Sequence, residues 1–482
     1  MSSASVPPPA TSLTAQRAHD PDNWLKVASW ILIAFSIAQV VVFSFGRDQG
    51  IYALVADGML QGEMPYRDLW DFKPPGIFFV YAIAQAVFGQ SMVAIRVLEG
   101  IFMVASAWAS RSIGEHLFQS KTAGLLGGAI ACMVHAQLEF WHTGQPETFA
   151  GSLTILALAL TLKTTPPSRR WIQWAVVGAL FGFCFLLKPP LGGGALACAI
   201  WAGITTKDRR QPLLRYLLPV LVMALGSAIP ILLCLLWFGA NDALEALKWT
   251  LGDFAPGYTA LSWHDKSPIG LLYHALSESL FDYSSLLTSG FLLLLALHGR
   301  PATEKRGATL IFSILSFQLI GIAIQGKFFQ YHFAASVPLL SLLAGQGYYK
   351  LFRRWAIGSL SGSLAFAALF SAMTFLSRPV NDVPGSPFQR MRARMLHLFT
   401  GGKALSRAEL DRHLHYVSDY NLDADRLVNA ALTKRLKPGD PLYIWGFEPV
   451  IYWLGNHQPA SRFIYNVPQR ARWERDKSRQ LL

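Results

Sequence analysis

Charged residues are scarce in this sequence of 482 residues: Asp, Glu, Lys and Arg make up 15% of it, against roughly 25% in a soluble globular chain. Hydrophobic residues make up 52%, and the mean hydropathy is +0.33. This composition excludes an ordinary soluble protein. It predicts a polytopic membrane protein, because apolar runs near the roughly 20 residues of a transmembrane helix recur between short basic clusters.

Cysteine and metal-ligand patterns are equally sparse. The four cysteines lie in or at the ends of apolar runs, without the spacing of a disulfide framework or a zinc site, so we interpret them as small buried residues. No cluster of His and carboxylates has ligand spacing, and we expect no metal and no cofactor. Nucleic-acid motifs are also lacking, so the net charge of +13 indicates the basic cytoplasmic loops of a membrane protein.

We expect no cleavable signal at the N-terminal end, since none is evident in the sequence. Residues 1–26 form a polar tail, rich in Pro, Ser and Ala at its start, which we expect to be disordered and cytoplasmic. The apolar run at 27–45 is too long for a signal core and has no obvious A-x-A site, so it predicts a retained span. Further runs, about eleven in all, fall at 92–110, 122–139, 148–162, 171–187, 189–205, 216–238, 284–298, 307–326, 333–349 and 356–377.

Lys and Arg mark cytoplasmic loops and so predict the topology. Five basic clusters lie at Arg111/Lys121, Lys163/Arg169/Arg170, Lys207/Arg209/Arg210/Arg215, Arg300/Lys305/Arg306 and Lys350/Arg353/Arg354. If all share one side, the opposite side holds 46–91, 140–147, the region around 188–190, 239–283, 327–332 and 378–482. The apolar stretch 74–88 then cannot be an ordinary span, and we interpret it as a helix lying flat at the outer interface. The alternative is a true span next to a miscounted neighbour.

The predicted architecture has three parts. Residues 27–377 form a transmembrane domain with a first outer loop at 46–91 and a large outer loop at 239–283. Residues 378–482 lack a long apolar run and predict a small soluble α/β domain outside the membrane. Its expected elements are a polar helical stretch around 405–436 and two β-like segments, PLYIWGF at 441–447 and SRFIYNV at 461–467.

Ionisable residues gather in the first outer loop, FGRDQGIYALVADGMLQGEMPYRDLWDFKPPG, from Phe45 to Gly76. Residues 50–60 have helical spacing and predict an interfacial helix. Asp48 lies where the first span leaves the bilayer, and a carboxylate there is costly unless it is hydrated, paired or used. Asp48 is therefore either a catalytic residue or an acid that merely ends the span at the water line.

The string GEMPYRDLWDFKPPG, preceded by RDQGIY, resembles the first periplasmic loop of bacterial glycosyltransferase family 39-like proteins, which have the GT-C fold. This family is related to protein O-mannosyltransferases, lipid A aminoarabinose transferases and rhizobial lipopolysaccharide core transferases. Further similar turns are Thr143–Phe149, Leu187–Pro190, Tyr331–Phe333 with Pro338, and Ile444–Gly446 with Pro459–Phe463. The turns within the membrane domain fall on the side that the charge pattern independently makes external.

The resemblance implies a set of site residues. Asp48 matches the catalytic acid of the family, and Glu147 lies where a second membrane-edge acid is expected. Glu147 has an alternative interpretation as a charge that stabilises a helix N-terminus. Lys73 matches a lysine that binds the lipid phosphate, although an interfacial lysine would also suit its position. Gln49 stands where many relatives carry Glu, which removes one candidate carboxylate.

Other cations and the loop itself complete the prediction. Lys188, Lys327 and His332 are further candidate phosphate ligands, and each alone could instead be an interface anchor. Tyr66 and Arg67 are expected to support the loop, Arg67 through an ion pair with Asp68 or Asp71.

The implied activity is that of an inverting glycosyltransferase of the GT-C type, which moves a hexosyl or pentosyl group from a polyprenyl-phosphate donor. The acceptor would be an envelope glycan, lipid or protein on the periplasmic side of the bacterial inner membrane. One alternative is a transporter or flippase of lipid-linked saccharides, which would show repeats and charges inside its spans. Another is a non-catalytic membrane subunit for envelope assembly.

Overall fold

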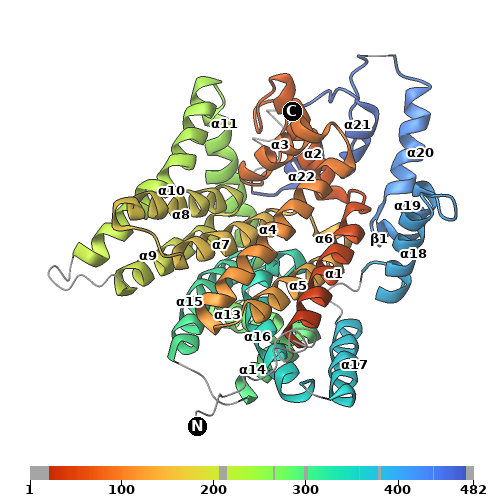
Figure 1. Cartoon of the computed structure of the whole chain (residues 1–482). Helices are drawn as coiled ribbons and strands as arrows, with labels where there is room; N and C mark the ends of the chain where they lie inside the picture. The colour runs from red at the N-terminus through yellow and green to blue at the C-terminus, as the bar shows by residue number, and fades with distance from the viewer. Residues whose placement is uncertain are drawn as a thin grey trace, which may run out of the picture.

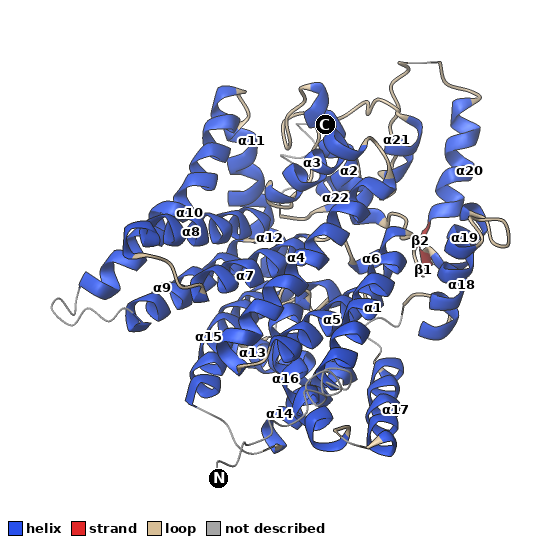
Figure 2. Ribbon diagram, viewed as in Figure 1, coloured by secondary structure: helices blue, strands red, loops and turns tan. Residues whose placement is uncertain are grey.

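The computed structural model describes residues 21–473, apart from 206–213, 264–265, 298–301, 358, 378–381 and 438. Residues 1–20 of the predicted tail, and Lys207, Arg209, Arg210 and Arg300 of the basic clusters, lie outside the described residues. The first helix already begins at Pro21, within the range predicted as tail. Most of the described chain is helical, as Figure 2 shows.

Each of the eleven predicted apolar runs contains a helix, and these helices form the bundle in Figure 1. They are α1 (Pro21–Val41), α4 (Met92–Phe118), α5 (Lys121–Gln137), α7 (Pro146–Leu162), α8 (Arg170–Leu187), α9 (Gly194–Thr205), α10 (Leu214–Ala240), α14 (Ser285–Ala296), α15 (Ala302–Gln325), α16 (Val337–Trp355) and α17 (Leu360–Leu376). The predicted fold class, a helical membrane protein, is confirmed.

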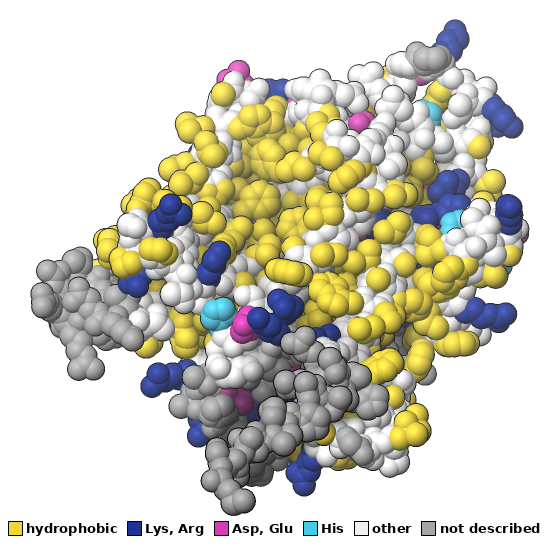
Figure 3. Space-filling model, viewed as in Figure 1, with side chains coloured by type: hydrophobic (Ala, Val, Ile, Leu, Met, Phe, Trp, Pro, Cys, Tyr) yellow, Lys and Arg dark blue, Asp and Glu magenta, His cyan; other side chains and the backbone are white. Residues whose placement is uncertain are grey.

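Length and composition decide which helices could cross a bilayer. Among the described residues, α1, α4, α8, α10 and α15 are long and apolar enough, and the α13–α14 pair, bent by 90°, is a sixth candidate. The helices α3, α7 and α17 are apolar but shorter. The expected total of about eleven spans therefore stays a prediction. Figure 3 shows hydrophobic side chains over most of the surface of the bundle in this view.

Small residues let the bundle helices approach closely, as is usual for helices packed in a membrane. The helix α5 contacts α1, α4 and α16, and α10 packs along α8. Where α5 meets α16, a Cβ added to Gly345 would lie 2.4 Å from the backbone nitrogen of Gly127. No side chain fits there, so the pair holds two helices together at backbone contact.

Short elements connect the bundle helices. They are α2 (Arg47–Gln61), α3 (Gly76–Phe88), α6 (Glu139–His142), η2 (Pro167–Arg169), η3 (Pro189–Gly193), α11 (Leu244–Lys248), η4 (Trp249–Phe254), α12 (Ala255–Ala260), η5 (Leu261–Trp263), α13 (Pro268–Ser277), η6 (Glu278–Asp282) and η7 (Gln330–Phe333). The helix α2 occupies the predicted interfacial helix 50–60. The 13 residues of α3 span only about 20 Å, less than the roughly 30 Å of a hydrocarbon core, which agrees with a helix that does not cross.

The C-terminal segment is mainly helical. It contains α18 (Pro387–Phe399), α19 (Arg407–Leu414), β1 (Tyr416–Val417), β2 (Tyr420–Asn421), α20 (Leu422–Thr433), α21 (Val450–Gly455) and α22 (Val467–Arg470). Within the described chain, its only sheet is the antiparallel β1–β2 pair. The segments 441–447 and 461–467, predicted as β-like, form no strands and are mostly irregular, with isolated bridges from Leu442 to Pro459 and from Trp70 to Phe463. The second bridge pairs 461–467 with the first loop and not with its own domain.

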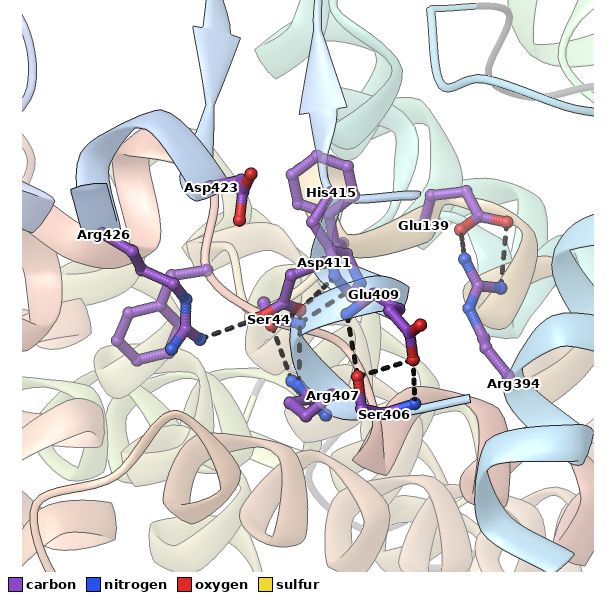
Figure 4. Close-up of polar contacts among 12 residues, drawn as sticks. Ser44, Glu139, Arg394, Ser406, Arg407, Glu409, Asp411, His415, Asp423 and Arg426 are labelled. Carbon is purple, nitrogen blue, oxygen red and sulfur yellow. Dashed lines mark hydrogen bonds and ion pairs between the residues drawn. The ribbon is translucent and has the colours of Figure 1, made fainter. Parts of the chain in front are cut away.

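Buried charges fasten this segment to the bundle, as Figure 4 shows. Glu139, at the start of α6, forms ion pairs with Arg390 and Arg394 of α18. Ser44, after α1, donates a hydrogen bond to Asp411 of α19 at 2.5 Å. The hydrophobic core is also continuous across this boundary, since Val450, Tyr452 and Phe463 belong to the same cluster as the bundle. The C-terminal segment therefore packs against the bundle and shares its hydrophobic core.

Candidate active site

One cavity, of about 950 Å³, collects most of the candidate site residues. It lies at the end of the bundle where α2, α6, η3 and η7 meet the C-terminal segment. Asp48, Lys73, Lys188, Lys327 and His332 all line it. Glu147 does not line the cavity but contacts Lys188, which does. Tyr66 and Arg67 do not line the cavity either. Five of the eight predicted residues thus face one space, although they come from three separate segments of the chain, at 46–91, 188–190 and 327–332.

Asp48 and Lys73 form an ion pair at this cavity, with 3.5 Å between Oδ2 and Nζ. Asp48 lies in the first turn of α2, where the helix dipole favours a carboxylate. Their side chains keep 24% and 18% of their exposure, so both can reach a bound molecule. Burial lowers the pKa of Lys73, but the carboxylates of Asp48 and Asp71 outweigh it and the pKa is raised. Lys73 is therefore a permanent cation at neutral pH.

The loop behind Lys73 is held by Tyr66. Its hydroxyl donates a hydrogen bond to the carbonyl of Lys73 at 2.7 Å, and its ring stacks on Phe238. The backbone of Tyr66 has φ +68°, in the left-handed region that residues other than glycine rarely adopt, so the chain turns sharply at this point. Arg67 points away and binds both carboxylate oxygens of Asp68. This geometry fits the predicted role of Tyr66 and Arg67 in supporting the first loop. The partner of Arg67 is Asp68 and not Asp71.

Asp48 is positioned by the turn at 140–145. Gln145 donates a hydrogen bond to Asp48 at 3.3 Å and accepts one from the hydroxyl of Tyr52 at 2.9 Å. The buried amide of Gln49 donates to the carbonyls of Phe140 and Thr143. A glutamate could not donate these bonds unless it were protonated, so Gln49 gives this chain a structural contact in place of the second carboxylate.

Glu147 and Lys188 form a second pair. Glu147, at the start of α7, is 1% exposed and accepts a hydrogen bond from Lys188 Nζ. The Nε2 atom of His332 lies 4.0 Å from the same carboxylate. Burial, followed by the charge of Lys188, keeps the pKa of His332 well below its usual value, so this ring is neutral. Glu147 therefore neutralises Lys188 and leaves the cavity without surplus charge there.

Lys327 lines the cavity and has no acidic partner among the residues that the structure describes. Its ammonium lies over the ring of Tyr258, and within the described part of the chain it has no hydrogen-bond partner. Burial, and then the positive charges of Lys73 and Lys188, lower its pKa to about 7. Lys327 is thus ready to receive an anion that enters the cavity.

Several residues that line or support the cavity are not predicted from the sequence. Asp71 is buried, and burial raises its pKa. It accepts a hydrogen bond at 2.6 Å from Tyr465, which is 394 positions away. His142 is 3% exposed, and among the described residues neither of its ring nitrogens has a hydrogen-bond partner. Asp71 could be found in the acidic loop string, but no local signal marked His142, Tyr258 or Tyr465.

Comparisons with known proteins agree with this architecture. Residues 72–237, roughly a third of the chain, match the family described as dolichyl-phosphate-mannose-protein mannosyltransferase. The undecaprenyl phosphate-alpha-4-amino-4-deoxy-L-arabinose arabinosyl transferase of Pseudomonas aeruginosa strain LESB58 is 25% identical over 74% of this chain and 67% of its own length. The protein of that name from Pseudomonas paraeruginosa PA7 is 25% identical over 47% of this chain and only 42% of its own.

A solved structure matches the fold over nearly the whole chain. ArnT from Cupriavidus metallidurans in the apo state covers 96% of this chain and 89% of its own, with a TM-score of 0.59 and 14% identity. The same protein bound to undecaprenyl phosphate gives a TM-score of 0.52 and 16% identity. The chain therefore has the fold of a GT-C membrane glycosyltransferase, and its long apolar helices are those of a multi-pass membrane protein. In sequence, it is similar to the aminoarabinose transferases named above.

Proposed function

We propose that this protein is an inverting glycosyltransferase that takes a sugar from a polyprenyl-phosphate donor at the periplasmic face of the inner membrane. The observation that carries the proposal is the Asp48–Lys73 pair at the cavity, which is also lined by Lys327, a cation with no hydrogen-bond partner among the described residues. The reaction needs a base for the acceptor hydroxyl and cations for the departing phosphate, and the cavity supplies both.

The proposed step is a single displacement. The acceptor oxygen attacks the anomeric carbon while the bond between that carbon and the phosphate oxygen breaks, so the configuration inverts. Asp48 accepts the hydroxyl proton. The electron pair of the broken bond stays on the phosphate, which changes from a monoanionic diester to a more highly charged monoester. Lys73 and Lys327 stabilise the charge that appears during the step, which is where electrostatic catalysis contributes most.

The remaining residues prepare the cavity. Lys188 is held by Glu147 and can bind the phosphate only by sharing that contact, so we assign it a secondary part. His332 is neutral and hydrogen-bonded to the carbonyl of Lys327, which orients the loop that carries this lysine. His142 lines the cavity with Asp48 and Tyr331, and its buried ring nitrogens have no hydrogen-bond partner among the described residues, so we assign it to the binding of sugar hydroxyls. This arrangement leaves the sugar to be either a hexose or a pentose.

The acceptor is proposed to be an envelope glycan, lipid or protein. Mass spectrometry of envelope glycans and glycolipids from a deletion strain tests this, with complementation by wild type and by Asp48→Asn. A missing sugar that wild type restores and Asp48→Asn does not restore supports the proposal. Identical profiles in all strains, or full restoration by Asp48→Asn, would contradict it.

We place the cavity on the periplasmic side of the membrane as a proposal, on the basis of the charge pattern. Cysteines at Gln61 and Gln90, exposed residues on either side of α3, should both react with an impermeant thiol reagent applied from outside. Gly76 itself does not suit a cysteine, because a Cβ there would lie 2.7 Å from the backbone of Leu186. Protection of Gln90 alone would mean that α3 crosses the membrane, and protection of both would place the cavity in the cytoplasm.

A further inference from the structure

The helix α18 has its charged and apolar faces the wrong way round for a helix in water. Arg390 and Arg394 are turned inward and are 4% and 1% exposed. Phe388, Leu396 and Phe399, in contrast, are 55%, 41% and 84% exposed. A helix of a soluble domain buries its apolar stripe and exposes its charges. The exposed stripe of α18 therefore needs an apolar environment.

The inward arginines have partners that fix this orientation. Arg390 donates hydrogen bonds to the carbonyls of Val383 and Gly385 and forms an ion pair with Glu139 at 2.9 Å. Arg394 binds both carboxylate oxygens of Glu139, a contact visible in Figure 4. A rotation of α18 that hid its apolar face would break these contacts and leave a buried carboxylate unpaired, which is strongly unfavourable. The exposure of the apolar face is thus built into the fold.

The apolar face of α18 continues the exposed apolar surface of α17. The preceding helix, α17, is apolar, and its exposed residues include Leu360, Leu364 and Leu376. Its last turn carries Phe375, whose ring lies 6.3 Å from the ring of Phe388. In Figure 1, α18 lies above α17 on the same edge of the molecule, and Figure 3 shows hydrophobic side chains continuing into this region.

A groove runs beneath α18 along the bundle. It has a volume of about 620 Å³, lies between α1, α5, α17 and α18, and is lined by apolar side chains over most of its length. Pro387 and Met391 of α18 close one end of it, next to Phe375, and Trp24 lies at the other end. The dimensions and the apolar lining suit a lipid acyl chain that descends from the level of α18.

We propose that α18 is an in-plane membrane helix, whose exposed face of Phe388, Leu396 and Phe399 enters the lipid leaflet at the cavity end of the bundle. The occupant of the face and of the groove is membrane phospholipid. Arg392 is the one arginine of α18 on the exposed side, and its long side chain can reach the lipid phosphates while Phe388 and Phe399 stay in the acyl region. Part of the C-terminal segment is then membrane-bound, although its sequence predicts a domain in water.

The test uses the full chain in lipid nanodiscs. The four native cysteines are buried, so a fluorophore sensitive to polarity can be attached at an introduced Phe399→Cys or, independently, at Leu396→Cys. Lys434→Cys, exposed after the polar α20, is the matched control. Nanodiscs with brominated acyl chains are compared with nanodiscs of ordinary phospholipid.

The inference predicts loss of emission with brominated lipid at positions 396 and 399, a blue-shifted spectrum at both, and no loss at position 434. Unquenched labels with a water-like spectrum at 396 and 399 would overturn it. Unquenched labels with a blue-shifted spectrum would also overturn it, because the face would then be covered by protein. Two independent positions keep the test valid if one variant does not fold.

Discussion

The ammonium of Lys73 lies 3.5 Å from the carboxylate of Asp48, so the proposed phosphate ligand and the proposed base are in direct contact before any donor binds. The pair keeps each charge partly desolvated at low cost, because each neutralises the other. A bound phosphate would compete with Asp48 for Lys73. Donor binding would therefore release the carboxylate toward the acceptor hydroxyl at the moment when a base is needed.

Lys73→Ala should raise the apparent KM for the donor by about one to two orders of magnitude, because a charge-assisted hydrogen bond to phosphate contributes roughly 1.5–3 kcal/mol. A fall in kcat as well would mean that the contact strengthens as the phosphate leaves. Lys73→Arg should recover part of the loss, since a planar fork meets the oxygens differently. Donor-saturation kinetics in one detergent measure both constants. Unchanged donor dependence in the Ala form would remove Lys73 from the site.

Donor binding should weaken as the pH rises through about 7, because Lys327 has a pKa of about 7 and binds an anion better when protonated. The affinity can fall by at most about tenfold per pH unit when one proton is linked to binding. Titrations of the inactive Asp48→Asn protein with the sugar diester donor, between pH 6 and 8, measure this without turnover. Lys327→Met should bind more weakly at pH 6 and show a flat profile.

Asp425 needs a separate control in that experiment, because burial raises its pKa to about 7 as well. It lies in α20 and does not line the cavity. Asp425→Asn should therefore keep the wild-type pH profile. If the pH profile becomes flat with Asp425→Asn and not with Lys327→Met, Asp425 is the titrating group, which contradicts our assignment to Lys327.

The variant Glu147→Gln tests whether Glu147 stabilises the fold or takes part in the reaction. Glu147 is 1% exposed and is paired with Lys188, so its neutral form leaves a buried cation unpaired and should destabilise the protein by roughly 3–5 kcal/mol. Adding Lys188→Met should restore much of that loss. Thermal denaturation of the single and double variants measures the coupling. Full stability of Glu147→Gln combined with lost activity would instead place Glu147 in the chemistry.

Glu139→Gln should loosen the C-terminal segment, because Arg390 and Arg394 both lose their shared carboxylate. Breaking a buried pair of this kind costs roughly 3–5 kcal/mol. We expect a lower melting temperature and faster proteolysis between α17 and α19. Arg392→Ala, on the exposed side of the same helix, should change stability by no more than about 0.5 kcal/mol. Equal effects of the two variants would mean that the Glu139 cluster does not hold α18.

Composition alone predicts much of the bundle, because a helix is the only way for an isolated apolar run to satisfy its backbone in lipid. Each predicted run contains a helix, and Asp48, Lys73 and Lys188 share a cavity, since the charge pattern and the similar turns place them at one end of the spans. Pattern reasoning is weaker where the partner is distant. The residues of 461–467 favour a β-like segment, but they cannot show that the backbone N–H of Trp70, in the first loop, donates to the carbonyl of Arg462.

The C-terminal segment illustrates the same limit. Its lack of long apolar runs predicts a water-exposed domain, yet Tyr465 completes the cavity through Asp71, and α18 exposes its apolar face. The arginines of α18 would be assigned to solvent by any rule based on local sequence. Only the position of Glu139, about 250 residues earlier, explains why they are turned inward.

The central claim is that Asp48 is the base of a transfer from a polyprenyl-phosphate sugar. The most direct measurement is the release of polyprenyl phosphate from purified, lipid-linked sugar donor, in the presence of an envelope extract, by wild type and by a folded Asp48→Asn variant. General-base assistance typically contributes 10²–10⁴-fold, so the variant should be slower by about that factor, with donor binding retained. Near wild-type release by Asp48→Asn would mean that Asp48 only caps α2, and no release by wild type would contradict the proposed activity itself.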